Sequence, residues 1–162
     1  MTPQIGEGSA GEGTESVRVS TVMGDREGPV GTAWTTSLAT PSVGHSPFVV
    51  VAKPNLPVVP FTLLVPAVDV VDQRHAQLTF GAAQVGVAAA VLDLKMDDPD
   101  GLLCLIASVW VDPLAQGEEA VFANTREATV AALKLGAAGG PWHRHLAEVE
   151  VPENPHFRRD AP

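Results

Sequence analysis

Arg18 and Ser20 are polar side chains inside ESVRVSTVM, an alternating stretch that is typical of a half-buried strand. The period of two places both residues on one face with Val22 and places the apolar side chains between them on the other face. A guanidinium is a planar donor that holds carboxylates, enolates or phosphates through paired hydrogen bonds. The stretch therefore predicts either an anion-binding site on this face or a structural ion pair with an acidic partner.

Three other residues have side chains that accept or move protons. Asp69 follows the apolar stretch TLLVPAV, and it is either a general base or the ion-pair partner of Arg18. The ion pair is favoured, because most strand carboxylates are structural or solvated. His45 lies in the loop GHSP, where a structural role is favoured over catalysis. His75 falls in the first turn of an expected helix, where an exposed side chain is favoured over a catalytic one.

Metal binding and thiol chemistry are not predicted. His143 and His145 form an H-x-H pair without a third ligand nearby. Cys104 is the single cysteine, and it lies in the apolar run LLCLIASVWV, where a buried thiol in a reducing compartment is expected. We therefore expect no metal, no cofactor and no disulfide within the chain.

The bulk composition narrows the class of protein. The chain has 162 residues, of which 45% are hydrophobic, enough for one folded domain with a core. Its formal net charge of −9 and its scattered basic residues argue against nucleic acid and anionic membranes as partners. No apolar run reaches the ~18 residues of a membrane helix, and no signal-peptide pattern opens the chain. We expect a soluble, cytoplasmic protein that binds a small molecule.

The elements that must position these residues alternate along the chain. Strands are expected over 14–23, 48–52, 62–72 and 102–112, and helices over 29–38, 72–94 and 116–135. The apolar stretch 48–52 is expected to be central in the sheet, and the proline-rich stretch 53–60 to be a connecting loop. About four strands and three helices predict an α/β fold of the two-layer α+β type.

The first helix is expected to bury Val30, Ala33, Trp34 and Leu38, and Asp72 is expected to cap the second. Residues 1–13 are rich in glycine and are expected to stay flexible or to settle only against a neighbour. Residues 14–137 are expected to form the single domain, and 138–162 a C-terminal tail.

Six motifs occur in one order along the chain: GEG–E, GD–GPVGTA, ATP–GH–P, PNLP–P–TL–VP, FG–AQ–VA–AV and EAT–AA. Each is weak alone, but the ordered set over residues 11–135 resembles the formaldehyde-activating enzyme family. The resemblance implies a fold similar to the second domain of ribosomal protein S5. It implies a lyase-type reaction in which formaldehyde condenses with the carrier tetrahydromethanopterin and water is lost. It also implies ring-like homopentamers with active sites between subunits.

The same resemblance places the family's reaction centre on this chain, with a changed chemistry. The catalytic histidine position is Arg18, and a guanidinium does not hand over a proton at any working pH. A carbinolamine needs such a donor to lose its hydroxyl as water. The carrier-contacting positions are an aspartate, an aliphatic residue, a lysine, a threonine and a glutamine in the family, and here they are Ser20, Val49, Ala67, Asp69 and Gln84.

The changed lining favours a divergent enzyme of this family. Its substrate is expected to be a small carbonyl or imine compound with an anionic group, converted by condensation, dehydration or cyclisation in specialised biosynthesis. Arg18 is then expected to bind the anion, Asp69 to orient it or move a proton, and Gln84 to hydrogen-bond the heteroatom. One alternative is a genuine formaldehyde-activating enzyme of one-carbon metabolism, with its acid relocated to His45 or His75. The other is a non-catalytic oligomer that binds a metabolite.

Overall fold

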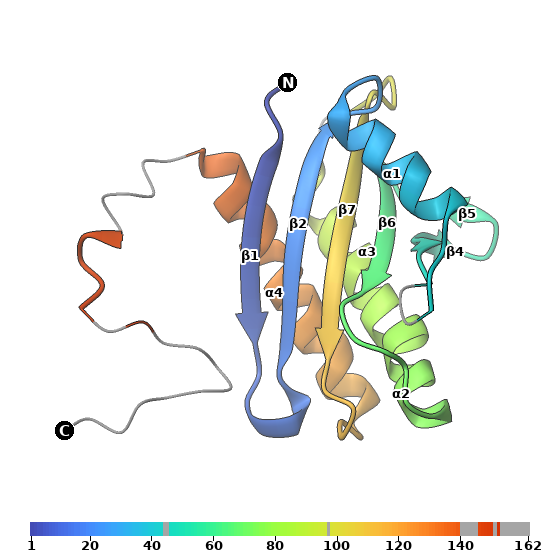
Figure 1. Cartoon of the computed structure of the whole chain (residues 1–162), viewed down its shortest axis with the longest axis vertical. Coiled ribbons are helices and arrows are strands. Elements are labelled where there is room, and N and C mark those ends of the chain that lie inside the picture. The colour runs from blue at the N-terminus through green and yellow to red at the C-terminus, as the bar shows by residue number, and fades with distance from the viewer. Residues whose placement is uncertain (44–45, 97, 140–145, 151, 153–162) are drawn as a thin grey trace.

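A computed structural model describes residues 1–162 except for 44, 45, 97, 140–145, 151 and 153–162. Its main element is a five-stranded sheet (Figure 1). In spatial order the strands are β1 (Gln4–Ala10), β2 (Val17–Asp25), β7 (Leu103–Val111), β6 (Phe61–Pro66) and β3 (Phe48–Val49). Neighbouring strands are antiparallel, except that β6 runs parallel to β7.

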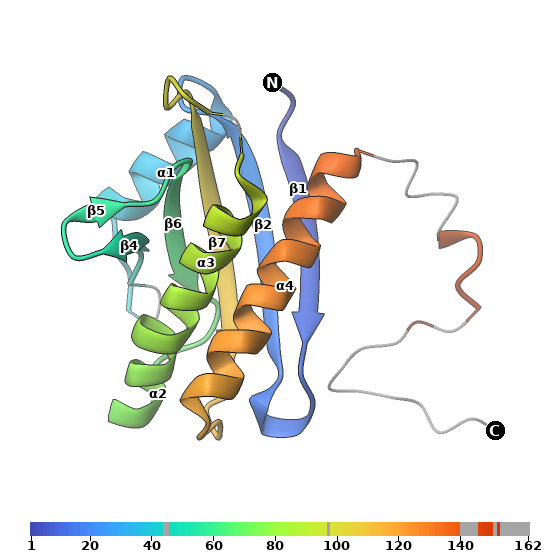
Figure 2. The same ribbon diagram turned by 180° about the vertical axis from the view of Figure 1, so that it is seen from behind.

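Helices cover the two faces of this sheet unequally. Figures 1 and 2 show α4 (Glu118–Ala138) on one face, beside a continuous helical stretch made of α2 (Gln73–Gln77), η2 (Leu78–Ala83) and α3 (Gln84–Leu94). We call this the back face. On the opposite, front face lies α1 (Pro29–Ala39), over one end of the sheet. The predicted two-layer α+β fold is confirmed, with α1 as a partial extra cover.

Alternation along the central strands decides which side chains enter the core. The buried residues of β2 and β7 that face the back are Val17, Val19, Thr21, Met23, Leu105, Ala107, Val109 and Val111. Between them, Arg18 and Trp110 point to the front and are partly exposed. The predicted face assignment of the strand that carries Arg18 is therefore confirmed.

The N-terminal segment was expected to be flexible, but residues 4–10 form the edge strand β1. Its glycines let α4 lie directly on the strand. A Cβ built on Gly6 would sit 1.9 Å from the carbonyl oxygen of Ala132, and one built on Gly8 would sit 2.1 Å from that of Ala128. Only glycine permits two backbones to approach so closely. The short helix η1 (Gly13–Glu15) then leads into β2.

The stretch 48–52 is not a central strand. It contributes the two-residue edge strand β3, and the chain continues into a small hairpin of β4 (Val51–Lys53) and β5 (Leu56–Pro57), where a loop was expected. Val50, between β3 and β4, is fully buried, and its backbone bonds to Thr62 on one side and Val58 on the other. The apolar stretch 48–52 is therefore buried in part by the hairpin, and not by a position in the interior of the sheet.

The helix expected over 72–94 is interrupted by the π-helical turn η2. Asp72 caps its start as predicted, since its carboxylate accepts from the N–H of His75 at 2.7 Å. The wide turn shifts the face that the helix buries, and Phe80 points outward and packs edge-on against Phe48. By length and composition Gln73–Leu94 is able to cross a membrane, but half of it is buried in the fold, as in a core helix.

Helix α1 buries less of its surface than predicted. Val30 and Gly31 are buried and Trp34 is partly buried, whereas Ala33 and Leu38 are exposed. No second helix flanks α1 on the front face within the described residues, so most of its circumference faces solvent.

Candidate active site

A polar row crosses the front face of the sheet through three neighbouring strands. The register pairs Glu7 of β1 with Ser20 of β2, and Ser20 with Ser108 of β7. Paired residues of neighbouring strands point to the same face, so the three polar side chains lie side by side. Arg18 lies on the same face two residues earlier in β2, opposite Trp110 of β7.

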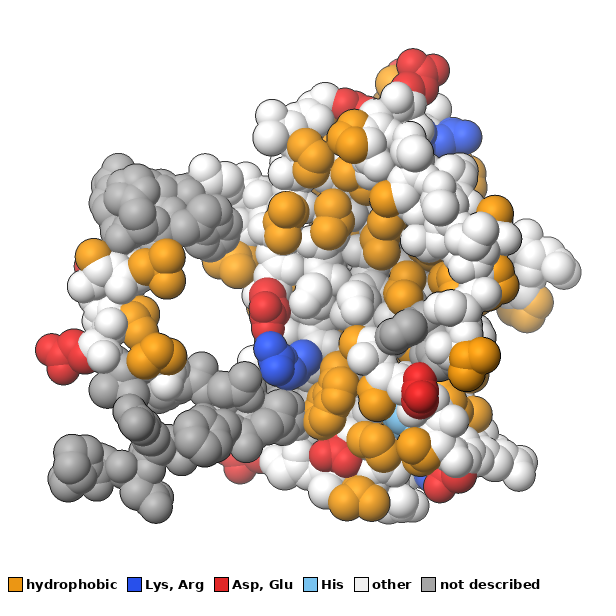
Figure 3. All heavy atoms as spheres, viewed as in Figure 1, with side chains coloured by type: hydrophobic (Ala, Val, Ile, Leu, Met, Phe, Trp, Pro, Cys, Tyr) orange, Lys and Arg blue, Asp and Glu red, His pale blue; other side chains and the backbone are white. Residues whose placement is uncertain are grey.

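Arg18 forms an ion pair with Glu7. Its Nη2 atom donates to Oε1 of Glu7 at 2.6 Å, and the two side chains are 35% and 56% exposed. Figure 3 shows a basic and an acidic side chain together on this face, with hydrophobic side chains above them and to their lower right. The favoured pairing of Arg18 with Asp69 is wrong. Strand order explains why, because β1 lies directly beside β2, whereas β7 separates β2 from β6 and from the exposed Asp69 that follows it.

A hollow of about 200 Å³ lies beside Arg18. The residues that line it are Arg18, Ser20, Ala67, Ser108 and Trp110. Three of the predicted site residues thus meet at one place, although they come from β2 and from the segment after β6. The N–H of Ala67 donates to the carbonyl oxygen of Val109 at 2.9 Å, which continues the ladder between β6 and β7 and holds that segment against the sheet.

Three polar residues line this hollow, and Glu7 is joined to them through its bond to Arg18. Arg18 supplies a fixed cation, Glu7 a carboxylate bonded to that cation, and Ser20 and Ser108 supply hydroxyls. A hollow of this size accommodates only a small molecule or one end of a larger one. Such a set is able to orient a carbonyl oxygen, stabilise negative charge on it and move a proton.

Val49 and Gln84 lie apart from this hollow. Val49 pairs with Leu63 in the edge strand β3. Gln84 is buried at the start of α3, where its Nε2 atom donates to the carbonyl oxygen of Val51 at 2.9 Å. Apart from Asp69 and His45, the predicted site residues therefore fall into two groups, one on the front face and one at the β3–β4 edge, and a single chain does not bring the groups together.

His75 is buried, and the prediction of an exposed side chain is wrong. The residue is 1% exposed, because α2 folds over the end of β7. Nδ1 accepts from the N–H of Val71 at 3.3 Å, so Nε2 carries the hydrogen that is donated to the carbonyl oxygen of Val111 at 3.1 Å. Both ring nitrogens are used within the fold. His45, His143 and His145 lie outside the described residues.

Sequence reasoning misses Glu7, Ser108 and Trp110 as site residues. For Glu7 a signal exists, since glycine and alanine at positions 6, 8 and 10 alternate with larger side chains at 5, 7 and 9. Because glycine and alanine occupy the buried positions, the alternation typical of a strand is easily mistaken for the composition of a flexible segment. Ser108 and Trp110 share the front face of their strand, but the strand alone does not say which residues of other strands lie beside them.

The sequence matches the model of one protein family over most of its length. The family is described as formaldehyde-activating enzyme (Fae), and the match covers residues 5–154. It extends the stretch 11–135 over which the motifs carry the resemblance.

Three archaeal relatives, each described as the bifunctional enzyme Fae/Hps, match this chain. The protein of Methanosarcina barkeri is 38% identical over 144 residues, which are 85% of this chain and 36% of the relative. That of Methanosphaera stadtmanae is 38% identical over 136 residues, 81% of this chain and 34% of the relative. That of Methanococcoides burtonii is 39% identical over 146 residues, which are 85% of this chain and 36% of the relative. This chain therefore spans about a third of the length of these curated relatives. Because the family model and these relatives agree over most of the sequence, the chain belongs to the formaldehyde-activating enzyme family.

Proposed function

We propose that this chain joins a small carbonyl compound, formaldehyde being the simplest, to an amine carrier with loss of water. The observation that carries the proposal is the meeting of Arg18, Ser20 and Ala67 around one hollow. The resemblance to the family places its histidine, aspartate and lysine at these three positions. Membership of a family described by the activation of formaldehyde supports the same reaction class, a condensation of the hydro-lyase type.

Glu7 replaces the acid that Arg18 cannot supply. In the condensation, the departing water takes its oxygen from the carbonyl compound and its two hydrogens from N–H groups of the carrier. A group that accepts a proton from nitrogen and delivers it to oxygen therefore serves both the addition and the dehydration. Glu7 is a carboxylate held 2.6 Å from the arginine at the family's acid position. We assign the proton transfer to Glu7, rather than to His45 or to the buried His75.

Arg18 has two roles in this proposal. Its bond to Glu7 orients the carboxylate, and its other N–H groups stabilise the negative charge that develops on the carbonyl oxygen when the amine attacks. The hydroxyls of Ser20 and Ser108 are placed to hydrogen-bond the same oxygen. Asp69 is exposed on the segment that carries Ala67, and its proposed role is to orient the carrier.

A second candidate is a carbonyl substrate that itself carries an anionic group. Its support is that a guanidinium has five N–H donors, and among the described residues only Glu7 accepts from Arg18. The other donors are then available for a substrate carboxylate. Glyoxylate and formaldehyde differ by one carboxylate, so the pair separates the two candidates.

We further propose that the active unit is a homo-oligomer, a pentamer by the resemblance to the family. The front-face residues and the group at the β3–β4 edge stay apart in one chain, and Gln84 is buried and bonded to Val51, so a second copy is expected to contribute its β3–β4 edge with Val49. Light scattering at micromolar concentration is expected to report a pentamer. A stable monomer would contradict this arrangement.

The test of the proposed function is the condensation rate with each carbonyl compound. Tetrahydromethanopterin is mixed with formaldehyde or glyoxylate, and the rate is measured against the spontaneous reaction without protein. We expect acceleration with formaldehyde and a loss of about 10²–10³-fold in Arg18→Ala. Faster turnover of glyoxylate than of formaldehyde would favour the second candidate. Acceleration of neither would overturn the proposal and leave a non-catalytic, metabolite-binding oligomer.

A further inference from the structure

A second and larger hollow lies at the other end of the front face, between α1 and the sheet. Its volume is about 500 Å³, within the range of small-molecule sites. The residues that line it are Arg26, Glu27, Gly31, Trp34, Thr35, Phe61, Leu102 and Cys104. It is separate from the hollow at Arg18, because Cys104 and Trp110 are six residues apart along β7, about 20 Å.

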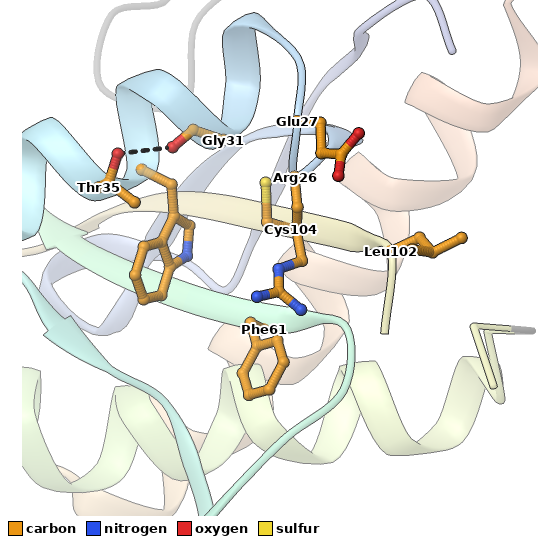
Figure 4. Close-up of a pocket in the computed structure, with 8 residues that line it drawn as sticks. Arg26, Glu27, Gly31, Thr35, Phe61, Leu102 and Cys104 are labelled. Atoms are coloured by element: carbon orange, nitrogen blue, oxygen red, sulfur yellow. Dashed lines mark hydrogen bonds between the residues drawn. The ribbon is translucent and has the colours of Figure 1, made fainter. Parts of the chain in front are cut away.

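Arg26 is held in place from two sides. Its Nη1 atom donates to the carbonyl oxygen of Gly101 at 2.7 Å, and its guanidinium carbon lies 5.1 Å from the centre of the Phe61 ring. Figure 4 shows the guanidinium directed toward Phe61, while Glu27 points away from it. The other N–H groups of this guanidinium have no partner among the residues that the structure describes. The hollow therefore has a fixed cation with free donors.

Two acidic groups near Arg26, Asp25 and Asp98, are engaged elsewhere. Asp25 forms an ion pair with the amino-terminal ammonium. Asp98 accepts from the backbone N–H groups of Leu102 at 2.7 Å and Leu103 at 3.2 Å. Glu27 is exposed at the rim. No carboxylate in the described part of the chain forms an ion pair with Arg26, so its charge is available to a ligand.

Apart from Glu27 and Thr35, the other side chains that line the hollow are apolar. Trp34, Phe61, Leu102 and Cys104 form its walls. Cys104 is buried as predicted, and burial raises the pKa of its thiol, an effect that Arg26 opposes, so the sulfur is a neutral surface. The Nε1 atom of Trp34 is buried without a hydrogen-bond partner among the described residues. Because the Trp34 ring lines the hollow, this indole N–H reports on a ligand that packs against the ring.

We propose that this hollow binds a small planar carboxylate, with the carboxylate on Arg26 and the apolar body against Trp34 and Phe61. The cation binds the charged end of the ligand, and the aromatic walls favour a flat apolar group over a polar one at its other end. The proposal does not depend on the function assigned to Arg18, because the two hollows share no lining residue.

Benzoate is the probe that tests this site, and the indole N–H resonances of the tryptophans are the readout. The resonance of Trp34 is assigned by its loss in Trp34→Phe. We expect benzoate to shift this resonance with a dissociation constant on the order of 1 mM, as suits so small a ligand. Benzyl alcohol, which has the ring without the charge, should leave it unmoved at the same concentration.

The matched variant is Arg26→Gln, which keeps a polar side chain with N–H donors but removes the charge. It should weaken benzoate binding at least about tenfold, while the remaining indole resonances show that the fold is intact. Arg18→Gln, at the other hollow, should leave benzoate binding unchanged. The proposal is overturned if benzoate does not shift Trp34, if it shifts Trp110 instead, or if Arg26→Gln binds benzoate as the unchanged protein does.

Discussion

The front and back faces of the sheet come from the same strands and carry different kinds of side chain. The back-facing positions 6, 8 and 10 of β1 are small and buried beneath α4, whereas positions 5, 7 and 9 are exposed. In β2, Val17 and Val19 are fully buried, and Arg18 and Ser20 lie between them on the front. Packing therefore fixes the residue types of the back face, and the proposed site lies on the front face.

Two ion pairs show the same contrast at the level of single contacts. Arg18 bonds to Glu7 at 2.6 Å on the front face, and Arg126 of α4 bonds to Asp93 of α3 at 2.6 Å on the helical layer. All four side chains are partly exposed, so neither pair is expected to contribute much to stability. Equal geometry in different surroundings makes the helical pair a matched control for the front-face pair.

The largest effect on stability is expected from Gly6→Ala on the back face. The added Cβ would collide with the backbone of Ala132, so β1 or α4 must move. We expect a loss of about 3 kcal/mol or more in the free energy of unfolding, measured by urea titration. Ser9→Ala, on the front-facing parity of the same strand, should change it by less than about 0.5 kcal/mol. Equal effects of the two variants would contradict the account of β1.

A smaller loss of stability is expected from His75→Phe. The replacement has a similar volume, but it leaves the N–H of Val71 and the carbonyl oxygen of Val111 without their side-chain partner. We expect a loss of about 2 kcal/mol in the free energy of unfolding and an unchanged condensation rate below the unfolding transition. A variant that is fully stable but inactive would restore His75 as the relocated acid.

Local patterns in the sequence predicted those features of the fold that depend on interactions between residues close together in the chain. The two faces of β2, the apolar β7 and the cap at Asp72 follow from side-chain period and from capping chemistry. The edge strand β1 was missed because its glycines are required by close packing against α4, which lies more than a hundred residues away in the sequence. The π-helical turn and the hairpin after β3 depend in the same way on packing against distant segments.

The candidate site was predictable only in part. The resemblance to the family named Arg18, Ser20 and Ala67, and the fold places them together. It did not reveal the partner of Arg18, because strand order, which sets Glu7 beside Arg18 and keeps Asp69 away, is a property of the whole sheet.

The most direct test of the central claim compares Glu7→Gln with Asp93→Asn in the condensation of formaldehyde with tetrahydromethanopterin. Each change removes one carboxylate charge from an ion pair of the same length. Both variants should keep their free energy of unfolding within about 1 kcal/mol of the unchanged chain. Glu7→Gln should lower kcat by about 10²–10⁴-fold with little change in KM, since an amide cannot carry the proton, and Asp93→Asn should leave both constants unchanged. An active Glu7→Gln protein, or an equal loss in the two variants, would contradict the assignment of proton transfer to the front-face pair.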